Sequence, residues 1–183
     1  MNFLNQFEIP ILNSLHEATH CAFLDAVMPV ITKLGNAGIF WILLAVVLLC
    51  FKKTRRAGVT MGISLIFGLV LCNLTIKPLV ARIRPYDFDT SIKLLIPPEH
   101  DFSFPSGHTI ASFEGAVSLF IYHKKYGIAA IALACVIAFS RLYLMVHYPT
   151  DVITAVILGI AVAIIASFVS KWLIKKTKMP VCD

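Results

Sequence analysis

The stretch PTDVITAVILGIAVAIIASFVSKWLI, residues 149–174, is long and apolar enough to cross a lipid bilayer, and it indicates the class of structure. Its two charged residues, Asp151 and Lys171, lie near its ends. In lipid a backbone segment must satisfy its own hydrogen bonds, and a helix does so. The stretch therefore predicts a transmembrane helix.

Four further apolar segments precede it: residues 35–51, 57–80, 107–122 and 126–146. The second and fourth of these reach the roughly 20 residues that a crossing helix needs. The segments 35–51 and 107–122 are shorter and need flanking residues or local thinning of the bilayer to cross. We expect an all-α, polytopic transmembrane helix bundle of about five spans, with its core in residues 35–174 of a single domain 1–183.

Composition supports a membrane protein. Of the 183 residues, 58% are hydrophobic and 14% charged, and the mean hydropathy is +0.84, which is far from the values of a soluble globular domain. The apolar runs are continuous rather than alternating, which argues against an outer-membrane barrel. The net charge of +6 is concentrated in the connectors between apolar segments, so it is interpreted as an orientation signal and not as a surface for nucleic acid.

Residues 1–34 form an amphipathic N-terminal region. Phe3, Phe7, Ile11 and Leu15 recur every four residues among polar positions. This pattern predicts a helix in the membrane interface, or a re-entrant hairpin that continues through residues 24–31 with a break near Pro29.

Basic residues are distributed unevenly between the two sides of the predicted bundle. One side holds ten of the sixteen: Lys52, Lys53, Arg55, Arg56, Lys124, Lys125, Lys171, Lys175, Lys176 and Lys178. The other side holds Lys33, Lys77, Arg82, Arg84, Lys93 and Arg141. Cytoplasmic connectors carry the excess of Lys and Arg. We therefore expect a multi-pass protein of the cytoplasmic (plasma) membrane whose second side is extracytoplasmic.

Three short stretches on that second side combine the chemically active residues. They are Lys77 with Arg84-Pro85, then Pro105-Ser106-Gly107-His108, then Ser140-Arg141 with His147 and Asp151. Each lies at the end of a predicted span. Together they supply three cations, two histidines and a carboxylate, which predicts a phosphate site at a membrane surface.

Taken singly, each stretch also has an ordinary structural explanation. Lys77 and Arg84 can reach from a helix end toward lipid head groups, and Ser106 or Asp151 can cap a helix. The functional interpretation rests on spacing. Arg84 is the seventh residue after Lys77, so one helical face can carry both if the helix continues. His147 lies four residues before Asp151, a spacing at which the carboxylate can orient the imidazole.

In this order, Lys-x6-Arg-Pro, Pro-Ser-Gly-His and Ser-Arg-x5-His-x3-Asp resemble the motifs of the type 2 phosphatidic acid phosphatase (PAP2) family of membrane lipid phosphatases. The resemblance covers about residues 25–172. Many members of that family have six spans, and this chain resembles them without the first.

The resemblance implies a two-step hydrolysis through a phosphohistidine. His147 would be the nucleophile, Asp151 would orient it, and His108 would act as general acid and then general base. The oxygens of the phosphoryl group would be held by Lys77, Arg84, Ser106, Gly107 and Arg141. With these donors, and with Asp151 committed to His147, we expect no metal and no cofactor.

The expected substrate is a lipid phosphate or diphosphate. Undecaprenyl diphosphate or monophosphate comes first, followed by phosphatidylglycerophosphate and phosphatidate. A lipid phosphotransferase and a non-catalytic transporter or lipid-binding protein remain alternatives. Vanadate-dependent haloperoxidases share the motifs but are soluble. The expected partners are the bilayer and the lipid substrate, with a homodimer left open and nucleic acid excluded. Glu114 either pairs with a donor inside the bundle or contacts the site from below.

Overall fold

The computed structural model describes residues 2–180, and all regular structure in that range is helical. The elements are α1 (Asn2–Thr19), α2 (Ala22–Lys33), η1 (Asn36–Gly38), α3 (Ile39–Cys50), α4 (Arg55–Gly68), η2 (Leu69–Ile76), α5 (Lys77–Val80), α6 (Pro85–Phe88), α7 (Gly107–Tyr122), α8 (Lys124–Tyr143) and α9 (Pro149–Thr177). A loop of residues 89–106 separates α6 from α7. The prediction of an all-α bundle is confirmed, whereas the extent of a single domain over 1–183 stays a prediction.

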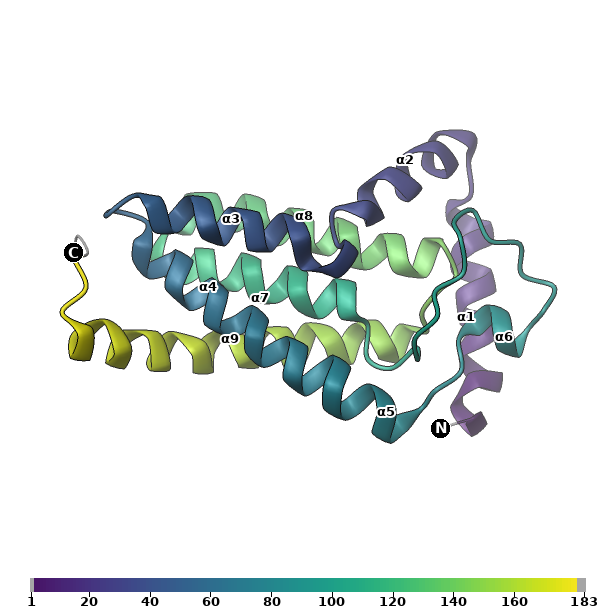
Figure 1. The fold of residues 1–183 in the computed structure, drawn as a ribbon. Coiled ribbons are helices and arrows are strands. Elements are labelled where there is room, and N and C mark those ends of the chain that lie inside the picture. Colours follow the sequence, from purple (N-terminus) through teal and green to yellow (C-terminus); the bar gives the residue numbers. More distant parts are fainter. Residues whose placement is uncertain (1, 181–183) are drawn as a thin grey trace.

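Helix α7 lies at the centre of the bundle, with α3, α4, α8 and α9 packed around it (Figure 1). Phe113, Ala116 and Leu119 of α7 join a core cluster that includes Trp41 of α3 and Ile137 of α8. Its neighbours therefore fix the position of α7, and with it the Pro-Ser-Gly-His stretch at its start.

Three of the described helical segments are long and apolar enough to cross a membrane: Arg55–Phe88, Lys124–Tyr143 and Pro149–Thr177. A fourth exists if α2 and the η1–α3 segment, which meet at 44°, count as one bent span. Helix α7 has 16 residues, fewer than the roughly 20 that a crossing needs. The prediction of five spans is thus met in part, because the expected third span is a short helix enclosed by the others.

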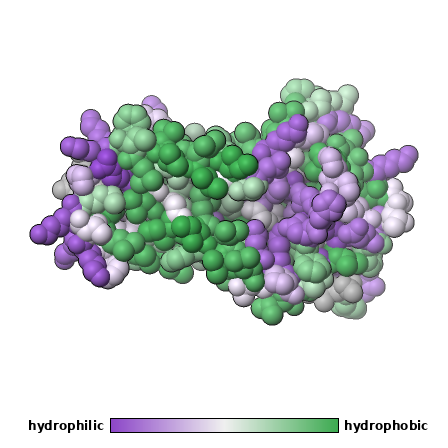
Figure 2. Space-filling model, viewed as in Figure 1, coloured by the Kyte–Doolittle hydropathy of each residue, from purple (hydrophilic) through white to green (hydrophobic). Residues whose placement is uncertain are grey.

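The outer surface of the bundle is apolar along its middle. Exposed side chains there include Val46 of α3, Ile66 of α4 and Ile157 of α9. Figure 2 shows this apolar band between two hydrophilic ends. Such a surface is stable against lipid chains and not against water, which agrees with a protein that spans a membrane.

The N-terminal helix α1 lies at one end of the bundle and crosses its direction, against α8 and α6 (Figure 1). It is amphipathic as predicted, but the predicted apolar stripe lies on its outer side, while Ile9 and Leu12 face the bundle. Phe3, Phe7 and Ile11 are exposed, whereas Asn5 and Glu8 are buried. The break predicted near Pro29 is wrong, since Pro29 lies within α2 and the chain turns instead at residues 20–21, between α1 and α2.

Helix α4 continues through η2 and α5 as one helical segment, which brings Lys77 to the end of the bundle where α1 lies (Figure 1). Segment η2 has the wider winding of a π-helix, a variation frequent at functional sites. The helical segment ends after Val80, where Ala81 adopts the left-handed conformation with φ 46°. Arg84 follows in extended backbone. Lys77 and Arg84 therefore do not share a helical face, contrary to the sequence-based expectation.

Close packing between α7 and α8 depends on a glycine. A Cβ added at Gly127 of α8 would lie 2.2 Å from the Cα of Phe120 and 2.6 Å from its backbone nitrogen. Backbone atoms cannot move aside as a flexible side chain can, so the approach of the two helices requires the absence of a side chain.

Gly127→Ala is expected to destabilise the protein by about 1–3 kcal/mol, the typical cost of overpacking. The measurement is thermal or denaturant unfolding of the detergent-solubilised protein. Gly62→Ala is the matched control, because an added Cβ there meets no atom within 4 Å and gains up to about 1 kcal/mol of helix propensity. Equal stability of the two variants would contradict this account of the α7–α8 contact.

Candidate active site

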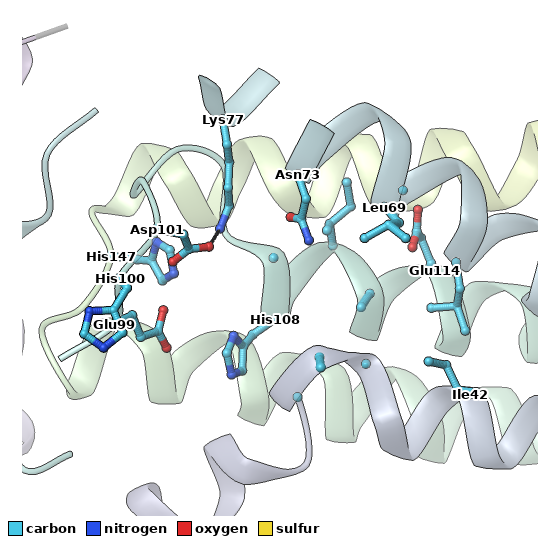
Figure 3. Close-up of a pocket in the computed structure, with 18 residues that line it drawn as sticks. Ile42, Leu69, Asn73, Lys77, Glu99, His100, Asp101, His108, Glu114 and His147 are labelled. Atoms are coloured by element: carbon cyan, nitrogen blue, oxygen red, sulfur yellow. Dashed lines mark hydrogen bonds and ion pairs between the residues drawn. The ribbon is translucent and has the colours of Figure 1, made fainter. Parts of the chain in front are cut away.

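The three motif stretches meet at one end of the bundle around a cavity of about 440 Å³. Lys77, Gly107, His108 and His147 line it directly. Figure 3 shows the Lys77 side chain extending to Asp101, with His147 behind that carboxylate and His108 further along the cavity. The remaining predicted residues, Arg84, Ser106, Arg141 and Asp151, are buried behind this lining.

His147 precedes helix α9, and Asp151 lies in its first turn. The imidazole Nδ1 lies 3.5 Å from Asp151 Oδ2. The same carboxylate oxygen accepts hydrogen bonds from Ser103 Oγ at 2.5 Å and from the backbone N–H of Tyr148 at 2.9 Å. Asp151 is therefore both the third residue of α9, in the capping box whose N-cap is Tyr148, and the neighbour of His147, so the two explanations considered from sequence hold together.

The other ring nitrogen of His147, Nε2, faces the cations. It lies 3.4 Å from Nη1 of Arg84. Burial, followed by the positive charges of Arg84 and Arg141, holds the pKa of His147 well below its usual range. A neutral imidazole keeps a lone pair, so His147 is suited to attack an electrophile held beside Arg84.

Lys77, Arg84 and Arg141 converge on two carboxylates of the loop between α6 and α7. Asp101 pairs with Lys77 and, at 2.5 Å, with Nη2 of Arg84. Glu99 pairs with Arg84 at 2.6 Å and with Arg141. The three cations are therefore paired with carboxylates in this structure. Lys77 and Arg84 are thus brought together by Asp101 and not by a shared helix.

Two effects act in opposite directions on the pKa of each loop carboxylate: burial raises the pKa, and the neighbouring cations lower it. Burial raises the pKa of Glu99, but the charges of Arg141 and Arg84 outweigh it and lower that pKa to about 2. Burial likewise raises the pKa of Asp101, and Lys77 and Arg84 lower it to about 2. Both groups are therefore ionised at neutral pH.

The start of α7 presents a backbone donor to the cavity. Gly107 lines the cavity next to Lys77: a Cβ added there would lie 3.7 Å from the Lys77 amine, an ordinary contact distance. Ser106 Oγ accepts a hydrogen bond from Thr109 Oγ1 at 3.0 Å, which leaves its own proton to donate. His108 Nε2 lies 2.8 Å from Asn36 Oδ1 in η1. These contacts hold the predicted general acid at the cavity wall.

Glu114 lies deeper in the same cavity, among apolar side chains such as Ile42 and Leu69 (Figure 3). Its Oε1 is buried without a hydrogen-bond partner among the described residues. The expectation that Glu114 pairs with a donor in the bundle is wrong. The alternative, that it approaches the site from below, agrees with its position in the cavity lining.

Several residues at the site were not predicted. Glu99, Asp101 and Ser103 come from the loop of residues 89–106, which has no helical periodicity to interpret. The acidic Glu99-His100-Asp101 run just before the second motif was an available signal. Arg82 was counted only as a connector charge, yet its side chain is buried against Asp151.

Glu99→Gln combined with Asp101→Asn is expected to tighten the binding of inorganic phosphate on the order of tenfold. The reason is that the anion no longer displaces two carboxylates from the cations. Isothermal titration of the detergent-solubilised protein measures this affinity. Asp89→Asn is the control from the same loop, since Asp89 is bonded to Ser91. Weaker phosphate binding in the double variant would mean that the carboxylates are needed to place the arginines.

Comparison with known proteins agrees with this geometry. Residues 55–175 match the model of the PAP2 superfamily. An undecaprenyl-diphosphatase of Sulfolobus acidocaldarius is 37% identical over 75% of this chain and 66% of its own length. The undecaprenyl-diphosphatase BcrC of Bacillus subtilis is 30% identical over 83% of this chain and 78% of its own.

A solved structure resembles the whole arrangement of helices. It is the transmembrane PAP2-type phosphatidylglycerolphosphate phosphatase of Bacillus subtilis, with a TM-score of 0.73 and 26% sequence identity over 93% of this chain and 88% of that one. The family expected from the three motifs is therefore confirmed by sequence and by fold. The chain belongs to the PAP2 superfamily.

Proposed function

We propose that the protein is a metal-independent membrane phosphatase that hydrolyses a lipid phosphate or diphosphate, with undecaprenyl diphosphate as the preferred substrate. The observation that carries the proposal is the position of the buried His147 between Asp151 and the cluster of Lys77, Arg84 and Arg141. The undecaprenyl-diphosphatases among the relatives support the choice of lipid.

In the first step, Nε2 of His147 attacks the terminal phosphorus. A phosphorus–nitrogen bond forms while the bond from phosphorus to the lipid oxygen breaks. His108 protonates that oxygen, and the lipid leaves. Asp151 faces Nδ1 and stabilises the positive charge that develops on the ring. His147 therefore supplies the nucleophile and Asp151 its orientation.

In the second step, a water molecule attacks the phosphohistidine. His108 takes a proton from the water, the phosphorus–nitrogen bond breaks, and inorganic phosphate is released with His147 restored. In both steps the transferring oxygens are held by charged and neutral donors: Lys77, Arg84, Arg141, Ser106 and the N–H of Gly107. These donors neutralise the developing charge, so the mechanism assigns no step to a metal ion.

The shape of the cavity supports an amphiphilic substrate. Its polar end holds the catalytic residues, and its other end is lined by Ile42, Leu65, Leu69 and Ala111. A head group can reach the cations while the adjoining carbon chain stays among apolar side chains. A lipid phosphate satisfies both ends, whereas a soluble phosphate ester satisfies one.

The active site is proposed to face the extracytoplasmic side of the plasma membrane. The site lies at the end of the bundle that holds Lys77, Arg84 and Arg141. The group of ten basic residues named above lies in the turn between α3 and α4, in the first turns of α4 and α8, and in or just after the last turns of α9. The excess of positive charge on cytoplasmic connectors supports this orientation. The substrate then presents its phosphate in the outer leaflet.

His147→Ala is expected to abolish phosphate release from a panel of undecaprenyl diphosphate, undecaprenyl phosphate, phosphatidylglycerophosphate and phosphatidate. Asp151→Asn removes orientation but keeps the nucleophile, so its loss should be smaller, on the order of 100-fold. Wild-type kcat/KM should be highest for undecaprenyl diphosphate. A His147→Ala rate above about one hundredth of wild type would refute the nucleophile, and a preference for phosphatidate would refute the proposed lipid.

Sidedness is testable with single cysteines in a background without the native ones. Ser91→Cys, in the exposed loop after α6, is expected to react with a membrane-impermeant thiol reagent in intact cells. Thr54→Cys, between α3 and α4, should react only after permeabilisation. The reverse labelling pattern would place the chemistry in the cytoplasm.

A further inference from the structure

Arg82 lies outside the residues assigned to phosphate binding, yet it is among the most buried side chains of the protein, with 1% of its surface exposed. Its Nη1 donates to Asp151 Oδ1 at 2.6 Å. The nearest phosphate-binding cation along the chain, Arg84, points instead to Glu99 and Asp101. Arg82 therefore contacts the Asp151 carboxylate beside His147, whereas Arg84 lies among the residues assigned to phosphate binding.

The rest of the Arg82 guanidinium is held by helix α1. Its Nε donates to Asn5 Oδ1 at 2.9 Å, and its Nη2 forms an ion pair with Glu8. Its flat face lies over the ring of Tyr148, 3.8 Å from the ring centre. Nε, Nη1 and Nη2 of Arg82 and one flat face of its guanidinium group all contact neighbouring side chains, so the guanidinium is held in one orientation.

Glu8 also contacts the first turn of α9 directly. Its Oε1 accepts the backbone N–H of Thr150 at 2.8 Å, and its Oε2 accepts the Thr150 hydroxyl at 2.9 Å. Thr150 is adjacent to Asp151 in the chain. A carboxylate is favoured at a helix N-terminus, where backbone N–H groups are free. Glu8 therefore anchors both Arg82 and the backbone that bears Asp151.

Charge explains why two residues are needed. Arg82 alone would neutralise Asp151 and weaken its support of a positive charge on His147. With Glu8 on its other side, Arg82 is shared between two carboxylates, and the three groups together keep one negative charge. The arrangement holds Asp151 in place while leaving its charge effective toward the imidazole.

We propose that Arg82 and Glu8 are positioning residues of the phosphatase: they hold the Asp151 carboxylate against His147, and through Glu8 the N-terminal helix α1 completes the active site. This inference rests on the proposed function. The competing explanation is that the Arg82–Glu8 pair only attaches α1 to the bundle, in which case its loss lowers stability without a specific effect on chemistry.

Arg82→Lys and Glu8→Gln test the proposal with small changes of shape. A lysine amine cannot reproduce the planar set of donors, and glutamine keeps the size of Glu8 without its charge. Each is expected to lower kcat by about 10- to 100-fold, as losses of supporting partners do, with KM within about twofold because the phosphate cations are unchanged. Glu17→Gln, exposed on the same helix α1, is the matched control and should keep the wild-type kcat.

A double-variant cycle separates positioning from general loss of structure. If Arg82 acts through Asp151, adding Arg82→Lys to Asp151→Asn should cause no more than about a twofold further loss of kcat. If the loss of kcat in the double variant equalled the product of the losses in the two single variants, the proposal would be overturned. So would a Glu8→Gln variant as active as Glu17→Gln.

A binding measurement gives a second readout that needs no turnover. Orthovanadate can bond to His147 Nε2, whereas inorganic phosphate needs only the cations. Arg82→Lys and Glu8→Gln should weaken orthovanadate about tenfold or more and leave phosphate affinity within about twofold. Equal weakening of both anions would overturn the positioning role. Absence of lipid phosphatase activity in the wild-type protein would instead refute the proposed function, and the anion comparison would still test the role of Arg82.

Discussion

Pairing of buried charge is the constraint on which this structure depends. Four cationic side chains are buried at one end of an apolar bundle: Lys77, Arg82, Arg84 and Arg141. An unpaired charge in such a place costs several kcal/mol. The carboxylates that pair with them come from α1, the α6–α7 loop and α9: Glu8, Glu99, Asp101 and Asp151. Segments far apart in the chain are thus held at one end by charge, while apolar packing around α7 holds the rest.

The sequence predicted those parts of the protein that depend on local pattern. The long apolar run of α9 and the three motifs were sufficient for the fold class and the family. The N-terminal helix was predicted from its four-residue period, but its exposed Phe3 and Phe7 show why the orientation could not be inferred. Next to lipid an apolar face can point outward, so the rule that assigns apolar residues to the core loses its meaning.

The missing site residues share a different cause. Arg82 looks the same in sequence as a lysine or arginine that reaches toward head groups, and only the fold shows its carboxylate partners. Glu8 looks like part of the polar face of a surface helix. Glu99 and Asp101 lie in a loop whose path depends on the arginines that it meets. Each role is created by contacts between distant segments, which residue spacing cannot encode.

In the proposed mechanism, the two loop carboxylates also affect the energetics of each catalytic cycle. Glu99 and Asp101 together carry two negative charges, and the inorganic phosphate product carries nearly the same at neutral pH. Substrate entry is thus an exchange of counter-ions, in which the anionic head group replaces the two carboxylates beside the cations. After hydrolysis the exchange is reversed: Glu99 and Asp101 pair again with Lys77, Arg84 and Arg141, and inorganic phosphate leaves. An enzyme built in this way carries its own competitor for product, which limits inhibition by the phosphate that it releases.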